Sequence, residues 1–343
     1  MIYIRTDTNQ TIAMGHLMRC IAIAEAARLF GEGALFFLAD ENGAEILEAR
    51  GFSYEIIGTE WNHMDKELPV LLPLLHKHGV KKLLVDSYSV TPEYLRELGK
   101  ETEVWYLDDL NAFHYPVQGL ICYANYYEKY DYPENYPKAK LLLGTSYVPL
   151  RTEFRDLSSH PSSDRIQKLL LLSGGADPEN VLERILSVLL PEGSSVSRDG
   201  ADFEIDVVCG RYYEKYEVLK KRFQENPNVR VFKTLPTLLP LMKEADLAIS
   251  AGGTTLYELC AAGTPTISYS MADNQLDNVR QFEKDGLMYY AGDAREKGFA
   301  AGIQRGVKHY EAMSMTERAE LTQRLQSTVD GKGALRIAKR LIL

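Results

Sequence analysis

The sequence predicts an α/β protein with two doubly wound domains that face each other across an inter-domain cleft. Three observations lead to this fold class. The chain has 343 residues, which is too long for one ordinary core and suits two domains of roughly 150 residues each. Short apolar runs alternate with amphipathic stretches along the whole chain. The apolar runs are continuous rather than alternating, which is typical of parallel strands covered by helices on both faces.

The apolar runs predict the positions of the strands in each half of the chain. In the first half, strands are expected at residues 2–5, 34–38, 54–57, 82–85, 104–107, 120–123 and 141–143. In the second half, they are expected at residues 169–172, 205–208, 230–232, 247–250, 266–269 and 288–290. Amphipathic stretches such as residues 16–30 and 92–98 predict helices between the strands.

The domain boundaries follow from a change in composition. Residues 155–164 form a polar, serine-rich stretch without periodicity, which indicates a linker. We therefore expect an N-terminal Rossmann-like domain over residues 1–154 and a C-terminal Rossmann-like domain over residues 165–325. The remaining residues, 326–343, are expected to contain a terminal helix that crosses back to the first domain.

The composition limits the classes of function and the cell compartment. The net charge of −9 and the pI near 5.4 argue against a nucleic-acid-binding surface, because such a surface is basic. The four cysteines have no CxxC spacing, which indicates reduced thiols in the cytoplasm and neither a disulfide framework nor a zinc site: Cys20, Cys122, Cys209 and Cys260. No apolar run reaches the roughly 18 residues of a membrane span, and the first residues indicate a strand, not a signal peptide. We expect a monomer without nucleic-acid partners.

The loop after the first strand contains a candidate general base. Open parallel sheets bind ligands beyond the carboxyl ends of their strands, and here Asp7 is followed by a loop that ends at Gly15 and by His16. Gly15 permits a tight turn, and the first N–H groups of the next helix form an anion site. The positive end of the helix dipole favours a neutral imidazole, which can accept a proton. Alternatively, His16 is a helix-terminal residue bonded to a local carbonyl.

A second loop has the composition of a nucleotide-binding turn. Residues 247–258 predict a strand, a small turn and a helix, and they contain Gly252, Gly253, Thr254, Thr255 and Glu258. The glycines let backbone N–H groups approach a diphosphate, and either threonine can cap the helix or bind a phosphate oxygen. Glu258 lies one turn further along the helix, where its carboxylate can accept hydrogen bonds from ribose hydroxyls. A capping box between Thr255 and Glu258 is the structural alternative.

Other strand ends carry weaker signals: Gly174 with Gly175, Asn274 with Gln275, and the acidic residues Asp86 and Asp109. The glycine pair can line a phosphate site or form a plain turn. The two aspartates can bind sugar substituents, and strand-end aspartates are also common turn formers and helix caps. The chain has no Asp-x-Asp pair for a metal bound to a diphosphate, and the neighbours Asp108 and Asp109 point apart at a strand end. We therefore expect no metal.

In order along the chain, these segments resemble the PseG family, the UDP-2,4-diacetamido-2,4,6-trideoxy-β-L-altropyranose hydrolases of pseudaminic acid biosynthesis. That family is similar in turn to MurG-like GT-B glycosyltransferases and to spore-coat polysaccharide proteins. The matching stretches are residues 5–7, 14–20, 84–88, 107–109, 142–144, 150–154, 173–178, 251–255 with Glu258, and 272–275. The chain departs from the family pattern where Ala13 replaces a glycine, Ser87 replaces a histidine and Tyr257 replaces a tryptophan.

The resemblance implies a GT-B fold and the hydrolysis of a UDP-sugar to UDP and free sugar, with inversion and without a cofactor. His16 would activate water at the anomeric carbon, in a first domain that binds the sugar and carries Asp7 and Tyr88 as further catalytic residues. The second domain would bind UDP, with Glu258 on the ribose and the Gly252–Thr255 turn on the diphosphate. The resemblance also implies that Asn274 helps to close the site. From their positions in the loops, Gly15, Gly174, Gly175 and Gln275 are further candidates for contacts with the nucleotide.

Two other hypotheses stay open. A GT-B glycosyltransferase would move the sugar from UDP to an acceptor, and Ala13 and Ser87 lie on the sugar side, where the two reactions differ. A lipid-directed transferase is expected to expose an apolar and basic patch on its first domain. A non-catalytic nucleotide-sugar-binding module would not need a neutral histidine at a helix start.

Overall fold

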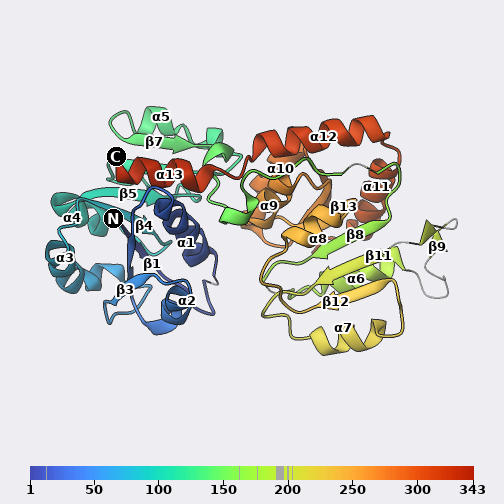
Figure 1. The fold of residues 1–343 in the computed structure, drawn as a ribbon, viewed down its shortest axis with the longest axis horizontal. Coiled ribbons are helices and arrows are strands. Elements are labelled where there is room, and N and C mark those ends of the chain that lie inside the picture. The colour runs from blue at the N-terminus through green and yellow to red at the C-terminus, as the bar shows by residue number, and fades with distance from the viewer. Residues whose placement is uncertain (13, 162, 176, 191–196, 199–200, 203) are drawn as a thin grey trace. The chain divides into compact units, whose positions relative to one another are not determined.

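The computed structural model describes residues 1–343 except residues 13, 162, 176, 191–196, 199–200 and 203. Three positions used in the sequence analysis lie outside the described residues: Ala13, Ser162 and Ala176. The chain divides into two compact units (Figure 1). One unit contains Met1–Arg155 together with Gly331–Leu343, and the other contains Asp156–Asp330.

The first unit is built on a seven-stranded parallel sheet with the strand order β3-β2-β1-β4-β5-β6-β7. Its strands are β1 (Ile2–Thr6), β2 (Ala34–Leu38), β3 (Ser53–Ile56), β4 (Lys82–Asp86), β5 (Glu103–Leu107), β6 (Gly119–Cys122) and β7 (Lys140–Leu143). The direction of winding reverses between β1 and β4, which are neighbours in the sheet. Open α/β sheets bind ligands beyond the carboxyl ends of the strands at such a reversal.

Helices cover both faces of this sheet, which explains why its inner strands β2, β1, β4, β5 and β6 are almost completely buried. The helices are α1 (Gly15–Arg28), α2 (Ala44–Ala49), α3 (Leu68–Lys77), α4 (Pro92–Glu101), α5 (Tyr132–Asn135) and α13 (Gly333–Ile342). Residues of α3 and α4 share one buried cluster with side chains of β2, β4 and β5. On the other face, α1 and α13 pack against each other and against β1. All five residues of β2 are buried, as two covered faces require.

The terminal helix α13 belongs to the first unit although its sequence follows the second. The guanidinium of Arg336 donates to the carbonyl oxygen of Ser146 at 2.8 Å, and that of Arg340 lies 6.0 Å from the ring centre of Trp105. Gly333 lies so close to the backbone of Val148 that an added Cβ would lie 2.2 Å from the Val148 carbonyl oxygen. The start of α13 is therefore packed closely against the backbone around Val148.

The second unit contains a six-stranded parallel sheet with the order β12-β11-β8-β13-β14-β15. Its strands are β8 (Lys168–Leu172), β11 (Glu204–Val208), β12 (Val229–Phe232), β13 (Leu247–Ala251), β14 (Thr266–Ser270) and β15 (Tyr289–Asp293). Its helices are α6 (Val181–Leu189), α7 (Tyr216–Phe223), α8 (Leu239–Glu244), α9 (Thr255–Ala262), α10 (Leu276–Lys284), α11 (Phe299–Glu311) and α12 (Met315–Thr328). Here the winding reverses between β8 and β13.

The predicted fold class is confirmed, because every predicted strand is present in one of the two parallel sheets. The short hairpin of β9 (Ser197–Arg198) and β10 (Ala201–Asp202) was not predicted. The four cysteines are buried and free. Within the described part of the chain, no helix is both long enough and apolar enough to cross a bilayer.

Candidate active site

At the reversal of the first sheet, a histidine and an aspartate form a buried pair. His16 is the second residue of α1, and Asp86 is the last residue of β4. Nδ1 of His16 lies 2.6 Å from Oδ1 of Asp86, and the two residues are only 6% and 1% exposed. An ionised carboxylate can only accept, so Nδ1 carries a proton, and in the neutral ring Nε2 then keeps a lone pair. This tautomer of His16 can act as a general base.

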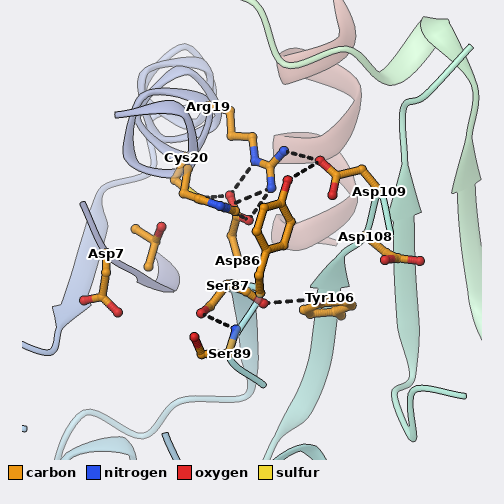
Figure 2. Close-up of polar contacts among 12 residues, drawn as sticks. Asp7, Arg19, Cys20, Asp86, Ser87, Ser89, Tyr106, Asp108 and Asp109 are labelled. Atoms are coloured by element: carbon orange, nitrogen blue, oxygen red, sulfur yellow. Dashed lines mark hydrogen bonds and ion pairs between the residues drawn. The ribbon is translucent and has the colours of Figure 1, made fainter. Parts of the chain in front are cut away.

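Asp86 is held in place by Arg19, one turn along α1 from His16. Nε and Nη2 of Arg19 donate to the two carboxylate oxygens of Asp86 at 2.6 and 2.5 Å (Figure 2). Burial would raise the pKa of Asp86, but the charge of Arg19 and the hydrogen bonds from Arg19 and His16 outweigh it and hold that pKa well below its ordinary value. Asp86 is therefore ionised at neutral pH, with both oxygens occupied. It orients His16 and has no oxygen left for a sugar substituent.

Tyr88 and Asp109 extend the cluster towards solvent. The ring of Tyr88 meets the imidazole of His16 edge-on, with the ring centres 4.4 Å apart, and the Tyr88 hydroxyl donates to Oδ2 of Asp109 at 2.9 Å. Nη1 of Arg19 donates to the same oxygen at 3.0 Å and to the hydroxyl of Tyr123 at 2.7 Å. Burial, and then the charge of Asp109, raise the pKa of Tyr88 far above its ordinary value, so the phenol stays neutral. Tyr88 is 47% exposed and can meet a ligand beside His16.

Asp7, which was also predicted to be a catalytic residue, makes its contacts elsewhere. Its Oδ2 accepts from Nη1 of Arg5 at 2.5 Å, and its Oδ1 accepts from the backbone N–H of Ala39 at 2.8 Å. Arg5 is in turn held by the carboxylate of Glu67, which is fully buried. Figure 2 draws Asp7 apart from the group around Asp86. Asp7 thus ties the end of β1 to the end of β2, and the structure does not bring it together with His16.

The adjacent acids after β5 point apart, as their positions at a strand end predict. Asp109 contacts Arg19 and Tyr88, whereas Asp108 accepts hydrogen bonds from the hydroxyls of Tyr115 and Tyr132 at 2.9 and 2.5 Å. Asp108 also accepts from two backbone N–H groups of the following loop. It is a buried anchor for that loop. Among the described residues, no group of three or more histidine, cysteine or acidic side chains could hold a metal ion.

In the second unit, the predicted Gly-Gly-Thr-Thr turn joins β13 to α9. The carbonyl oxygens of Gly252 and Gly253 accept from the side-chain amide of Asn278, at 3.0 and 3.5 Å. Asn278 is buried, and its Oδ1 accepts from the hydroxyl of Tyr257 at 2.9 Å. A Cβ on Gly252 would lie 2.6 Å from Cγ1 of Val279, so this position requires glycine. The N–H group of Gly253 donates to the carbonyl oxygen of Ala251 at 2.8 Å, which closes the turn directly before α9.

The start of α9 tests the capping box that is the structural alternative for this turn. Thr254 is the N-cap residue, its side chain makes no capping hydrogen bond, and Thr255 is the first residue of the helix. The capping box between Thr255 and Glu258 is therefore not formed, since Thr255 does not occupy the N-cap. Thr254 is exposed, and Glu258 is partly exposed in the first turn of α9. Both side chains lie at the helix end where an anion would bind.

The second predicted glycine pair lies after β8, the neighbour of β13. Gly174 has a φ of +80°, and a Cβ on either Gly174 or Gly175 would meet open space. Gly210, which follows β11, lies against both: its Cβ would be 2.0 Å from the Gly174 carbonyl oxygen and 2.3 Å from that of Gly175. The two carbonyl groups thus face Gly210. This arrangement is that of a backbone turn shaped by close packing at the end of the sheet.

The predicted amides lie in a short 3₁₀ turn, Asp273–Gln275, beside the glycine turn. Oε1 of Gln275 accepts from the backbone N–H of Met271 at 3.0 Å, and Cβ of Gln275 is 3.0 Å from the position of a Cβ on Gly252. Asn274 is exposed. Gln275 therefore supports the turn, while Asn274 is available to a ligand.

Several residues of these two sites were not predicted, and each had a signal in the sequence. Arg19 lies three residues after His16, which places both on one helix face. Tyr123 directly follows β6, and Gly210 lies two residues after β11, so both are strand-end residues. Asn278 lies three residues after Gln275 in the helical segment that follows β14. Their roles depend on which strands and helices are neighbours in space.

Comparison with protein families finds a match in the second half of the chain. Residues 171–335 match the glycosyltransferase family 28 C-terminal domain. This match contains the Gly174–Gly175 turn, the Gly252–Thr255 turn and Glu258. The solved structure of MurG from Acinetobacter baumannii superposes with a TM-score of 0.69 and 12% identity, covering 99% of this chain and 98% of that one.

Three curated proteins are similar in sequence. An uncharacterized protein of Methanocaldococcus jannaschii is 26% identical over 78% of this chain and 54% of its own length. The spore coat polysaccharide biosynthesis protein SpsG of Bacillus subtilis is 21% identical over 96% of this chain and 94% of its own. The pseudaminic acid cytidylyltransferase and UDP-2,4-diacetamido-2,4,6-trideoxy-β-L-altropyranose hydrolase of Helicobacter pylori is 23% identical over 83% of this chain.

The chain spans about half the length of two of these relatives, 54% of the archaeal protein and 47% of the Helicobacter pylori protein. The sheet orders, the family match and the superposition agree with one another. The chain therefore has the GT-B fold, and its residues 171–335 are similar to the glycosyltransferase family 28 C-terminal domain.

Proposed function

We propose that this protein hydrolyses a UDP-linked 2,4-diacetamido-2,4,6-trideoxy sugar to UDP and the free sugar, as part of pseudaminic-acid-type biosynthesis. The observation that carries the proposal is the 2.6 Å contact between Nδ1 of His16 and Oδ1 of Asp86. It leaves Nε2 of His16 as a proton acceptor beside the half-exposed ring of Tyr88. A neutral imidazole with a fixed tautomer is the group that activation of water requires.

The proposed reaction is a single displacement. Nε2 of His16 removes a proton from a water molecule as the water oxygen attacks the anomeric carbon. The bond between that carbon and the phosphate oxygen breaks, and its electron pair leaves with UDP. One displacement inverts the anomeric centre and requires no enzyme nucleophile. Cys20, the thiol next to Arg19, is a poor candidate for that role, because burial and then the charge of Asp86 raise its pKa well above the ordinary value.

The second unit is proposed to bind the nucleotide. The carboxylate of Glu258 accepts hydrogen bonds from the ribose hydroxyls, and the Gly252–Thr255 turn and the start of α9 receive the diphosphate. The N–H groups of such a turn, together with the helix dipole, stabilise the negative charge that develops on departing UDP. Asn278 supports this part of the proposal because it holds the carbonyl groups of the turn. No cofactor or metal is required by the proposed reaction.

The second candidate function is transfer of the sugar from UDP to an acceptor. The observation that favours it is the match of residues 171–335 to the glycosyltransferase family 28 C-terminal domain. The same histidine would then deprotonate an acceptor hydroxyl in place of water. The two candidates share the nucleotide site, and they differ in what attacks the anomeric carbon.

Products from a panel of UDP-sugars, analysed by mass spectrometry without any acceptor, distinguish the candidates. Hydrolysis predicts free sugar and UDP in equal amounts from at least one diacetamido-trideoxy sugar, and much less from UDP-N-acetylglucosamine. The His16→Asn variant serves as the control for background hydrolysis. No consumption of any UDP-sugar until an acceptor is added would instead establish transfer.

A further inference from the structure

Arg19 is a buried cation that joins two acidic strand ends of the first unit. It is 9% exposed, binds both oxygens of Asp86 and also donates to Oδ2 of Asp109 at 3.0 Å. Its Nη2 lies 3.0 Å from Nδ1 of His16. Because Nδ1 carries a proton in the tautomer described above, both facing nitrogens are donors, and this contact is not a hydrogen bond. The guanidinium thus touches both the candidate base and the carboxylate that orients the base.

The charges around His16 give this contact a chemical consequence. Asp86 and Asp109 supply two negative charges, and Arg19 supplies one positive charge. The hydroxyls of Tyr88 and Tyr123 stay neutral, because burial above all raises the pKa of each, that of Tyr123 to about 12. Without Arg19, two carboxylates without a compensating cation would act on the imidazole and favour the imidazolium form. An imidazolium cannot accept a proton from water.

We propose that Arg19 is a positioning residue for the reaction: it clamps Asp86 against His16, and its charge keeps the imidazole in the neutral form that accepts a proton. This inference rests on the proposed function, because Arg19 acts through the base of that reaction. The two parts of the role are chemically separable. The clamp requires the planar two-pronged guanidinium, whereas any cation at the same place supplies the charge.

In the part of the chain that the structure describes, the ionisable groups of this cluster come from α1 and from the ends of β4, β5 and β6. Its own helix α1 supplies Arg19 and Cys20, and the thiol of Cys20 lies 3.4 Å from Oδ2 of Asp86. The end of β4 supplies Asp86 and Tyr88. The end of β5 supplies Asp109 and the end of β6 supplies Tyr123, both joined to Nη1 of Arg19. Since the thiol and the two phenols are neutral, Arg19 is the cation that offsets the two carboxylates in this cluster.

The test compares Arg19→Met with Arg19→Lys in the full chain by two readouts. The first is ¹⁵N NMR of the His16 imidazole, which reports the tautomer and the pH at which the ring gains a proton, and needs no substrate. The second is the pH dependence of kcat/KM for UDP-sugar hydrolysis. Arg28→Met is the matched control, because Arg28 lies on the same helix and contacts Phe52 and the carbonyl oxygen of Gly51, away from His16.

Arg19→Met removes the charge and the clamp, so we expect the midpoint of the His16 titration to move up by about one pH unit or more. The acid limb of the pH–rate profile should move up with it. Arg19→Lys keeps the charge and loses the clamp. Its acid limb should stay near that of the wild type, while the rate falls at every pH and the NMR spectrum shows a mixture of tautomers. Arg28→Met should match the wild type in both readouts.

A purely structural role for Arg19 predicts a different result. The rate of Arg19→Met would then fall equally at all pH values, with an unmoved titration of His16, and this outcome would overturn the inference. If Arg19→Met does not fold, Asp109→Asn tests the same inference, because it removes a negative charge from the cluster in place of the positive one. Removing a negative charge should lower the midpoint of the His16 titration, and an unchanged midpoint would again overturn the inference. Because the NMR readout needs no substrate, it gives an answer even if no UDP-sugar is hydrolysed.

Discussion

Nδ1 of His16 lies 2.6 Å from Oδ1 of Asp86, so the start of α1 and the end of β4 share one buried contact although 70 positions separate the two residues. The contact exists because β4 is the neighbour of β1, the strand from which the chain passes into α1. It fixes which nitrogen of the imidazole carries the proton. The proposed role of His16 as a base therefore depends on its contact with Asp86.

The Asp86→Asn substitution should lower turnover by on the order of 10²–10⁴. The amide can donate to Nδ1, which favours the tautomer with a proton on Nε2 and removes the acceptor. UDP affinity should not change, because we assign the nucleotide to the second unit. Asp65→Asn is the control, since Asp65 is exposed and accepts a hydrogen bond from Thr91 away from His16. A rate for Asp86→Asn within threefold of the wild type would contradict the orienting role.

The Glu258→Ala substitution should weaken UDP binding at least tenfold. A hydrogen bond to a charged group contributes about 1.5–3 kcal/mol, and the carboxylate is proposed to accept from two ribose hydroxyls. Isothermal titration calorimetry with UDP measures the change, and Glu258→Gln keeps the side-chain volume as a second variant. Glu283→Gln on the exposed part of α10 controls for the general loss of a negative charge. Unchanged UDP affinity in Glu258→Ala would remove Glu258 from the nucleotide site.

The Gly252→Ala substitution should destabilise the second unit, whereas Gly253→Ala should not. A Cβ on Gly252 would lie 2.6 Å from Cγ1 of Val279 and 3.0 Å from Cβ of Gln275, while one on Gly253 would meet nothing within 4 Å. Overpacking of this kind costs about 1–3 kcal/mol, which corresponds to a decrease in Tm of roughly 2–10 °C. Thermal unfolding followed by circular dichroism, without ligand, measures both variants. Equal Tm values for the two would show that the turn tolerates a side chain at either position.

Hydrolysis should continue in EDTA at an unchanged rate. The carboxylates of Asp108 and Asp109 are bound to different partners and point apart, so they do not form a pair for a metal on the diphosphate. The proposed stabilisation of departing UDP comes from the N–H groups of the Gly252–Thr255 turn and from the start of α9. Initial rates before and after chelation, and after addition of magnesium or manganese, test this expectation. Loss of activity in EDTA with recovery on adding metal would refute it.

Much of the fold could be predicted because strands covered on both faces must be apolar at every position. The run Ala34–Leu38 illustrates this, since all five residues are buried. The order of the strands could not be predicted in the same way. Nothing in the local sequence of residues 82–86 indicates that this strand pairs with residues 2–6 and not with residues 53–56.

The candidate site could likewise be predicted only where the signal is local in the sequence. His16 and the Gly252–Thr255 turn have local signals, because a glycine before a helix start and a strand–glycine–helix pattern are visible in the sequence. Asp7 and Asp86 both follow apolar strands and cannot be told apart by pattern alone. Only the neighbouring side chains separate them: Arg5 and Ala39 bind Asp7, while His16 binds Asp86.

Hydrolysis in ¹⁸O-labelled water, with early NMR spectra of the sugar, tests the central claim most directly. If His16 activates water at the anomeric carbon, the label enters the free sugar, UDP stays unlabelled, and the inverted anomer appears first. The His16→Asn variant should incorporate label at a rate lower by about 10²–10⁴, while it binds UDP as tightly as the wild type does. Label in UDP would mean that water attacks phosphorus, and retention of the anomeric configuration would require an enzyme nucleophile. Either result would contradict the proposed mechanism.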